Sequence, residues 1–403
     1  MNFNMKNYFL TLVILVMCTV SHAQETITFP NQSTVITTGV PFMLIAPDAR
    51  SASMGDMGVA TSVDAYAQQW NAAKYTFSEA KSGVAVSYTP YLSKLVNDIS
   101  IAYLTYFNRI DERSSFAVSF KYFGLGEIEI RPDEFSEPLI EKPNEFTFDA
   151  SYALRLADQF SMAVSLRYLR SDLRIQSVDS NASAAGSFGV DISGFYQSEE
   201  EAYNSFNGRT RLGFAIQNLG PKIKYDDGGT ENFLPTNLRL GGGFDFIFDD
   251  YNTLSLTAEV TKLLVPTPPL FGFVDTNGDG VQDDDEPKII TEGKSNDVSF
   301  FKGVFQSFGD APGGFSEELK EITWALGAEY LYQESFAFRA GYFNESDDKG
   351  ARKFFALGAG FKYTTINIDL SYLFSASKIQ SPLENTLRFS LTFNFGDGTY
   401  DEY

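Results

Sequence analysis

LRFSLTFNF, from Leu387 to Phe395, alternates apolar and polar residues without a break. Because successive side chains of a β-strand point to opposite faces, the pattern places all the apolar side chains on one face. The segment before it, from Ile366 to Phe374, alternates in the same way. Strict alternation of this kind is typical of a strand that has an apolar environment on one side and a polar one on the other.

The whole chain contains about fourteen such segments, most of them about 8–12 residues long. A tilted strand needs roughly 9–11 residues to cross a bilayer, and bacterial single-chain barrels have an even number of strands. We therefore predict an all-β fold, a fourteen-stranded antiparallel transmembrane β-barrel. Closing the sheet into a barrel removes its free edges, so no backbone group is left unpaired in lipid. The predicted strands are 83–90, 98–107, 114–123, 145–155, 159–169, 186–197, 209–218, 236–245, 252–262, 321–332, 335–343, 354–363, 365–374 and 386–395.

The connections between these strands alternate in length after the first pair. Tight turns are predicted at Ala157-Asp158 and Gln333-Glu334. Membrane barrels have tight periplasmic turns and longer extracellular loops, whereas a large secreted β-sandwich, the alternative for this composition, has no reason to segregate them. The predicted extracellular loops are 124–144, 170–185, 219–235 and the very long 263–320.

The N-terminus predicts export. An apolar run from Tyr8 to Val20 is too short to span a bilayer, and Ser21-His22-Ala23 offers the small-x-small pattern that signal peptidase cuts. A signal peptide over 1–23 would remove the only cysteine, Cys18, and the only histidine, His22. Such a mature chain lacks thiols and imidazoles, which excludes Ser-His-Asp and Cys-His catalysis and zinc sites built on His or Cys. We expect no catalytic residues and no enzymatic activity.

The charge and the aromatic content also limit the function. A formal net charge of −21 argues against nucleic acid as a partner, because phosphates attract cations. Aromatic residues make up 15% of the chain, yet no stretch after the signal peptide approaches the 18 apolar residues of a membrane helix. Both observations fit a barrel in the bacterial outer membrane, with its loops facing the cell exterior.

Residues 24–82 precede the first strand and do not alternate. They contain Pro41, Pro47 and a run rich in Ser, Ala and Gly, and they are too apolar in patches to remain free in solution. We predict that they form a plug in the lumen, ahead of a barrel at 83–395 and a short tail at 396–403. Gly241-Gly242-Gly243, within a strand, predicts room for the plug or a kink. Charged residues on the polar side of the strands, expected to pair within a water-filled or plug-filled lumen, are Asp149, Arg155, Arg167, Glu259, Glu329, Arg339, Asp369 and Arg388.

PDARSASMGDMGVAT, from Pro47 to Thr61, is followed by Asp64 and by Trp70-Asn71-Ala72-Ala73-Lys74. This order resembles the start of the PorV family of the type IX secretion system, which is built on a FadL-like fourteen-stranded barrel. The shared element is A-R-x-x-x-M-G-x-x-G-V-A, and this chain has Ala72 where the family usually has proline. The resemblance covers essentially the whole chain.

The resemblance marks a set of candidate residues in the plug. Gly55 and Gly58 allow close approach or a positive φ in a crowded lumen, and Asp48 and Arg50 are candidates to pair with the luminal charges. The alternative is that these residues only fix the plug in place. The candidate plug residues are Asp48, Arg50, Met54, Gly55, Gly58 and Asn71.

The resemblance also implies a function. A PorV-like protein would bind the C-terminal signal domains of cargo leaving the type IX translocon and deliver them to the sortase, or attachment, complex at the cell surface. Outer-membrane lipids would surround it. The alternative is a FadL-like passive transporter of hydrophobic small molecules. An outer-membrane lipid hydrolase is disfavoured by the missing histidine.

DTNGDG, from Asp275 to Gly280, followed by five residues and Glu286, matches the loop of a calcium-binding EF-hand. Residues 270–274 and 287–290 look extended instead of helical, so the prediction is a structural calcium ion in an isolated loop. The alternative is a solvated acidic turn, because D-G and N-G pairs favour turns. The predicted ligands are Asp275, Asn277, Asp279, the Val281 carbonyl, Asp283 and Glu286.

The long loop 263–320 is unusually rich in phenylalanine for a segment outside lipid. Phe301, Phe305 and Phe308 are the candidate partner-binding residues, because exposed aromatic patches mark interaction sites. The alternative is that these rings pack on one another as a cap over the barrel mouth.

Overall fold

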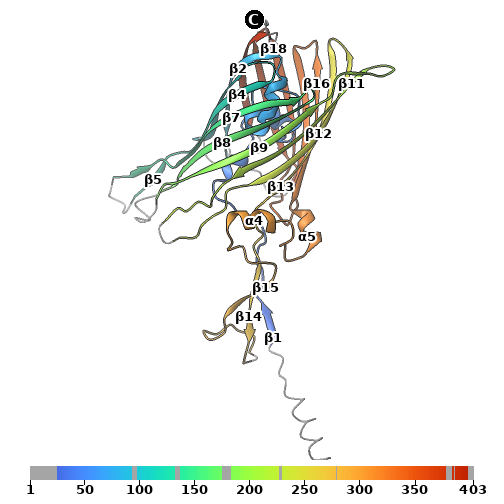
Figure 1. Ribbon diagram of the computed structural model, residues 1–403. Helices are drawn as coiled ribbons and strands as arrows, with labels where there is room; N and C mark the ends of the chain where they lie inside the picture. Colours follow the sequence, from blue (N-terminus) through green and yellow to red (C-terminus); the bar gives the residue numbers. More distant parts are fainter. Residues whose placement is uncertain are drawn as a thin grey trace, which may run out of the picture.

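Fourteen antiparallel strands close into a barrel among the described residues of the computed structural model (Figure 1). The structure describes residues 25–92, 98–131, 137–174, 183–226, 229–277, 279–377, 384 and 386–397. Each strand pairs with its neighbours in sequence, and β2 pairs with β20 to close the barrel. The barrel strands are β2 (Ala80–Pro90), β3 (Ile99–Arg109), β4 (Ser114–Leu125), β7 (Asn144–Ala157), β8 (Phe160–Asp172), β9 (Ala185–Gln197), β11 (Asn207–Leu219), β12 (Asn237–Asp249), β13 (Asn252–Leu263), β16 (Ile322–Tyr332), β17 (Phe336–Asn344), β18 (Lys353–Tyr363), β19 (Ile366–Ser375) and β20 (Leu387–Asp397).

The predicted fold class is confirmed, and each of the fourteen predicted strands has its counterpart. Alternation places the side chains as expected: on β20, Leu387 and Phe389 are exposed on the outer face, whereas Arg388 and Ser390 are buried inside. None of the described helices is long and apolar enough to cross a membrane. The predicted signal peptide, 1–23, and residues 398–403 of the predicted tail lie outside the described residues.

The two ends of the barrel differ. Tight turns join β7 to β8 and β16 to β17 at the end where the C-terminus lies, which we take as the periplasmic end (Figure 1). The opposite, extracellular end carries the long loops. The elements in the connections are β5 (Ile128–Ile130), β6 (Leu139–Glu141), β10 (Glu201–Ala202), β14 (Leu270–Asp275), β15 (Lys288–Glu292), α4 (Phe300–Gln306) and α5 (Phe315–Lys320).

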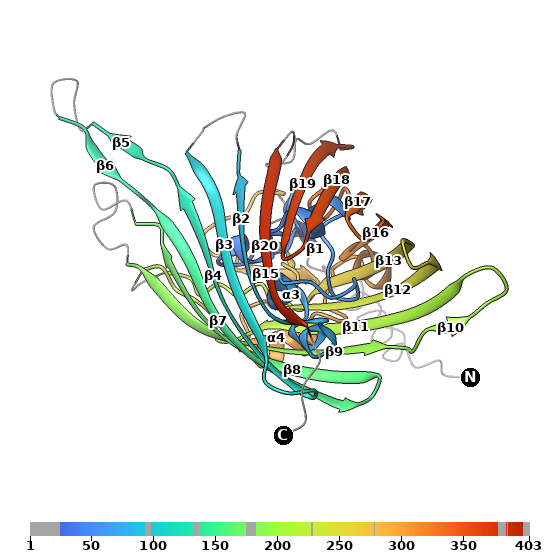
Figure 2. The same cartoon turned by 90° about the horizontal axis from the view of Figure 1, so that it is seen from above.

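The N-terminal segment has two parts. The short strand β1 (Glu25–Thr28) lies outside the barrel, where it pairs with β14 in a three-stranded sheet that projects beyond the extracellular mouth (Figure 1). The chain then enters the lumen, so the predicted plug segment, 24–82, fills the barrel only in its second part (Figure 2). The plug elements are η1 (Pro41–Leu44), α2 (Ala49–Ser53), α3 (Ala67–Trp70) and η2 (Ala72–Phe77).

Candidate functional site

Arg50 anchors the plug to the barrel wall. Its Nε and Nη2 donate to the two carboxylate oxygens of Glu329 on β16, at 2.9 and 2.7 Å. Within the plug the same guanidinium pairs with Asp64 and donates to the Ser62 carbonyl at 3.0 Å. Arg339 on β17 also donates to Glu329. A buried bidentate pair fixes position as well as charge, so α2 is held in one place against β16.

A second anchor uses the backbone of the plug. The N–H groups of Gly58 and Val59 each donate to Oε2 of Glu259 on β13, at 2.9 Å. Oε1 of Glu259 accepts from Nη1 of Arg239 on β12, also at 2.9 Å. Both oxygens of this buried carboxylate are therefore used, as a polar group away from water requires.

Glycines let the wall approach the plug closely. Gly55 has a φ of +88°, in the left-handed region that favours glycine. On the wall, a Cβ added at Gly327 would lie 2.8 Å from the Met54 carbonyl oxygen, and one added at Gly241 would lie 2.6 Å from Cγ1 of Val59. Within the run predicted to make room for the plug, Gly241 and Gly243 do so, whereas Gly242 points outward.

Asp48 and Asn71 stabilise the plug itself. The Asp48 carboxylate accepts from the backbone N–H of Ser51 at 2.7 Å, which caps α2, and from Nε1 of Trp70 at 3.2 Å. Asp48, a candidate to pair with a luminal charge, instead helps to fix the plug, because its oxygens accept from the helix cap and the indole. Nδ2 of Asn71 donates to the carbonyls of Val59 and Gly194, each at 2.9 Å, and so joins the plug to β9.

The predicted luminal charges pair with one another or with the plug, with one exception. Arg167 pairs with Asp149, and Arg339 donates to Asp369 at 2.6 Å. Arg388 lies 3.2 Å from Asp56 in the plug. Arg155 is the exception: it lies at the periplasmic mouth, over the ring of Phe77.

Two buried lysines of the lumen were not predicted. Nζ of Lys74 donates to the Gly58 carbonyl at 3.0 Å and to Oγ1 of Thr61 at 2.9 Å. Nζ of Lys121, on β4, donates to the Ile45 carbonyl at 2.7 Å. Lys121 follows the alternation of its strand and could have been found by it, whereas Lys74 lies in a segment without periodicity.

The extracellular helix α5 is held over the barrel mouth by buried ion pairs. Nζ of Lys262, at the end of β13, lies 3.1 Å from Oε2 of Glu318 and 2.6 Å from Oε2 of Glu321. Lys349, between β17 and β18, lies 2.5 Å from Oε1 of Glu317 and 3.2 Å from Oε1 of Glu321. These contacts join the C-terminal end of the long loop to two parts of the barrel rim.

The apolar face of α4 points away from the protein. Phe301, Phe305 and Phe308 are spaced to lie on one side of a helix, and they are 65%, 77% and 55% exposed. The opposite side carries Gly303 and Ser307, both buried. The alternative expected these three rings to pack on one another, but their exposure shows that they do not bury one another. The rings of Phe300 and Phe301 lie 4.0 Å apart.

The second helix, α5, also exposes its apolar side chains and buries a polar one. Phe315 and Leu319, four residues apart, are 78% and 52% exposed, whereas Glu318 between them is buried. The sequence pattern could have indicated this pair, because helix positions four apart share a face. We define the outward residues Phe301, Phe305, Phe308, Phe315 and Leu319 as the cap surface.

Burial under the cap affects one carboxyl group strongly. Burial raises the pKa of Asp310 to about 6, a hydrogen bond from Gln306 opposes the rise, and Glu318 and Glu321 add to it. Oδ2 of Asp310 accepts from the Thr267 N–H at 3.2 Å, whereas Oδ1 has no partner among the described residues. The charged form of Asp310 is therefore poorly compensated.

The acidic loop between β14 and β15 is hydrogen-bonded internally. Its flanks are strands, as predicted. Oδ2 of Asp275 accepts from the Gly280 N–H at 2.9 Å, and Oε1 of Glu286 accepts from the Thr276 N–H at 2.6 Å. Among the described residues, which leave out Gly278, no three acidic side chains converge as metal ligands.

Calcium binding by this loop therefore remains a prediction from the sequence motif. The other predicted ligands form two contacts: Asp279 accepts from the N–H of Val281, and Asp283 accepts from Asn277.

Comparison with known proteins gives a family match. The model of the family described as type IX secretion system protein PorV matches residues 29–270. No curated protein sequence matches the chain. Similar solved structures include the toluene transporter TbuX of Ralstonia pickettii, with 12% identity, 88% of this chain and 100% of that chain covered, and a TM-score of 0.48. The toluene transporter TodX of Pseudomonas putida is 10% identical, with 90% of this chain and 98% of that chain covered and a TM-score of 0.48. A FadL homologue of Pseudomonas aeruginosa is 13% identical, with 91% of this chain and 100% of that chain covered and a TM-score of 0.44.

Proposed function

This chain belongs to the family of type IX secretion system protein PorV, and we propose that it carries secreted proteins from the translocon to the surface attachment complex. It is an outer-membrane β-barrel that is associated with that secretion system. In this proposal it recognises the C-terminal signal domain of its cargo, hands the cargo to the sortase of the attachment complex, and performs no catalysis itself.

The cap surface is the observation that carries the proposal. A helix at a protein surface normally buries its apolar side, but α4 and α5 both bury small or polar residues and expose Phe and Leu. Exposed aromatic side chains that gather outside lipid are typical of protein-docking sites. The cap surface therefore fits a partner that offers an apolar patch of its own.

The support beneath the cap surface is rigid enough to favour docking. The ion pairs of Lys262 and Lys349 fix α5 to the barrel rim. The helix α4 is joined to α5 through Asp310, which accepts from Gln306 and donates its N–H to Glu318. A binding surface that is already ordered loses little conformational entropy when a partner binds. The alternative, passive transport of hydrophobic molecules, would need an apolar route past the plug, where Arg50 of the plug and Glu329 of the wall form a buried ion pair.

The test is a set of variants in the secreting cell. We expect Phe301→Ser, Phe305→Ser and Phe308→Ser together to leave the barrel folded and in the membrane while secreted proteins keep their C-terminal signal domains. The readouts are heat-modifiable migration of the barrel and the size of the cargo proteins. The matched control is Leu139→Ser with Ile140→Ser, which removes exposed apolar side chains from the β5–β6 hairpin instead.

Normal cargo processing in the triple variant and in a Phe315→Ser, Leu319→Ser variant would reject the cap surface as the docking site. Normal processing in a strain that lacks the protein altogether, combined with loss of uptake of hydrophobic compounds, would favour the transporter instead.

A further inference from the structure

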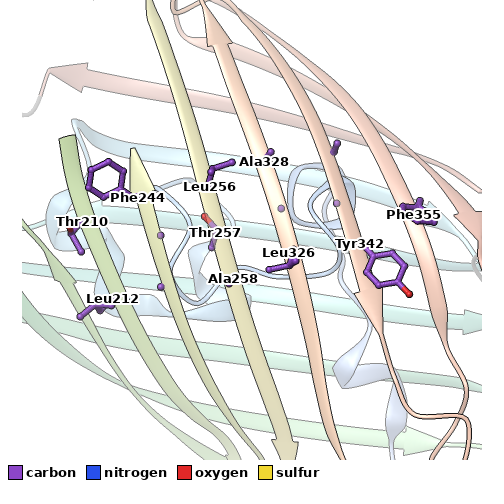
Figure 3. Close-up of a pocket in the computed structure, with 15 residues that line it drawn as sticks. Thr210, Leu212, Phe244, Leu256, Thr257, Ala258, Leu326, Ala328, Tyr342 and Phe355 are labelled. Atoms are coloured by element: carbon purple, nitrogen blue, oxygen red, sulfur yellow. The ribbon is translucent and has the colours of Figure 1, made fainter. Parts of the chain in front are cut away.

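A hollow of about 740 Å³ lies on the outer face of the barrel, between β11 and β18 (Figure 3). Its floor is made by small outward residues on four neighbouring strands: Gly242, Ala258, Ala328 and Ala340. Larger apolar residues such as Leu212 and Phe355 form its sides. None of the fifteen described residues that line it is charged. We call this hollow the outer groove.

The outer groove lies over a place where the wall and the plug are in close contact. On the luminal side of the same strands, Gly327 and Gly341 face Met54 of the plug, and a side chain at either position would overlap its backbone. The wall can therefore approach the plug to backbone distance here. Since the outward residues at this place are also small, the approach on the inside leaves a depression on the outside.

Aromatic groups border the outer groove at both ends. Toward the periplasmic side, Phe244 packs on Phe246 with ring centroids 4.8 Å apart. Toward the extracellular side, Tyr342 packs on Trp324 at 5.5 Å and on Phe355 at 4.7 Å. Tyr and Trp gather at the boundaries of a membrane, so Tyr342 and Trp324 mark the extracellular boundary and the groove lies on the hydrocarbon side of it. An acyl chain is the chemistry that fits an uncharged hollow at that depth.

The charged side chains near the two ends of the outer groove differ in sign between the extracellular and the periplasmic side. Lys353 begins β18 two positions before Phe355, on the same outward side of the strand, at the extracellular boundary. Its partner is the well-exposed Asp347, at 2.8 Å, and such surface pairs are weak enough to exchange. The turns at the periplasmic ends of β12 and β16 instead carry Asp249, Asp250 and Glu334. An anionic headgroup is therefore favoured only on the extracellular side.

We propose that the outer groove binds one acyl chain of a phosphorylated lipid of the outer leaflet, lipopolysaccharide, with its phosphate beside Lys353. Lipid tails are as apolar as the wall, so the preference over bulk lipid comes from close packing and from the headgroup contact. The groove would give the barrel a fixed lipid contact on the β11–β18 side. This site does not depend on cargo binding and goes beyond the proposed function.

The experiment counts lipids on the full-length mature protein. Protein depleted of lipid in mild detergent is titrated with purified lipid A, or with phosphatidylglycerol, and bound lipids are counted by native mass spectrometry. We expect one lipid A to bind. Filling the groove with Ala258→Phe and Ala328→Phe should weaken that binding about tenfold, and Lys353→Glu should weaken it about fivefold.

Two control variants match these changes. Ala102→Phe with Ala150→Phe adds the same rings to outward positions on β3 and β7, and Lys362→Glu reverses a charge at the other end of β18. Both should bind lipid A like the unmodified protein, and all variants should migrate as folded barrels. Undiminished lipid A binding in the filled-groove variant would overturn the proposal. So would equally tight phosphatidylglycerol binding, or a dimer of the chain that the filled groove abolishes.

Discussion

At the scale of single residues, the contact between plug and wall depends on positions where no side chain fits. Gly341 on β17 faces the backbone of Met54. By contrast, Gly242 on β12, three strands along the sheet, points outward and has Cδ2 of Leu212 as its nearest contact, 3.4 Å from an added Cβ. Two glycines on the same side of the barrel therefore carry opposite consequences for substitution.

We expect Gly341→Ala to destabilise the barrel and Gly242→Ala to be tolerated. An added methyl group at Gly341 meets backbone, which cannot move without displacing the plug, and overpacking of this kind costs roughly 1–3 kcal/mol. The measurement is the temperature at which the heat-modifiable band disappears on a gel. Equal temperatures for the two variants would show that the plug does not press on the wall at Gly341.

The Arg50–Glu329 pair offers a second test at this scale. We expect Arg50→Ala to loosen the plug, which should raise the ion conductance of the purified protein in planar bilayers. Removal of one partner from a buried pair costs on the order of 3–5 kcal/mol, and the lower end applies because Arg339 still contacts Glu329. Arg174→Ala, which removes a partly exposed surface pair with Asp172, is the control. Conductance that stays at the control level would mean that the plug is held by other contacts.

The luminal residues also show how far a sequence predicts a site. The alternation of each strand predicted that Glu329 and Arg339 face the lumen, because this depends on one strand alone. The partners of each charge could not be predicted, because they depend on the register between strands and on the path of the plug. Asp48 shows the same limit: its contact with Trp70 depends on the path of the plug, which alternation does not report.

At the scale of elements, regular strands were predictable and the short elements of the long loop were only partly so. Each barrel strand has a period of two over many residues, which is a strong signal. By contrast, α4 has only seven residues and turns its apolar side outward, so no buried stripe marks it as a helix. The strand β1 was missed because its partner, β14, lies more than two hundred residues away.

The cap should respond to pH through Asp310. Its pKa of about 6 in the folded cap lies above the ordinary value, so the folded cap binds a proton at mildly acidic pH that the opened cap releases. Stability of the cap is therefore greatest below the ordinary pKa and falls as the pH rises through about 6. We expect severalfold faster proteolysis of 263–320 at pH 7.5 than at pH 5.5. Asp310→Asn should remove this difference, and if the difference persists in that variant another group is responsible.

The acidic loop at 275–286 makes a prediction about metal ions. If the six predicted ligands bind calcium, the ion should slow proteolysis within 263–320 and chelator should reverse the effect, while the barrel stays intact. Glu286→Gln should abolish the protection, because position twelve supplies a bidentate ligand. Asp285→Asn, one residue earlier in the same loop, is the control. Cleavage that is equal with calcium and with chelator would leave the hydrogen-bonded acidic turn as the complete description.

At the scale of the whole molecule, the chain runs once through its own barrel. From β1, the first described element, it runs beside β14 outside the extracellular mouth, fills the lumen as the plug and emerges near the periplasmic end to begin β2 (Figures 1 and 2). This path joins the extracellular loops, the plug and the wall into one unit: Gly39 bonds to Phe233 in one loop, and Lys349 bonds to Thr34 in another. The cap surface is thus supported from both the rim and the N-terminal segment.

The most direct test of the account is binding of an isolated cargo domain to the purified protein. The C-terminal signal domain of a protein secreted by this system is titrated against the barrel in detergent, and the dissociation constant is measured. We expect the Phe301→Ser, Phe305→Ser, Phe308→Ser variant to bind at least about thirtyfold more weakly, because aromatic anchors at an interface contribute about 2 kcal/mol or more. The Leu139→Ser, Ile140→Ser control should bind like the unmodified protein. Equal affinities for the triple variant and the unmodified protein, or no binding to either, would contradict the proposal that the cap surface carries cargo.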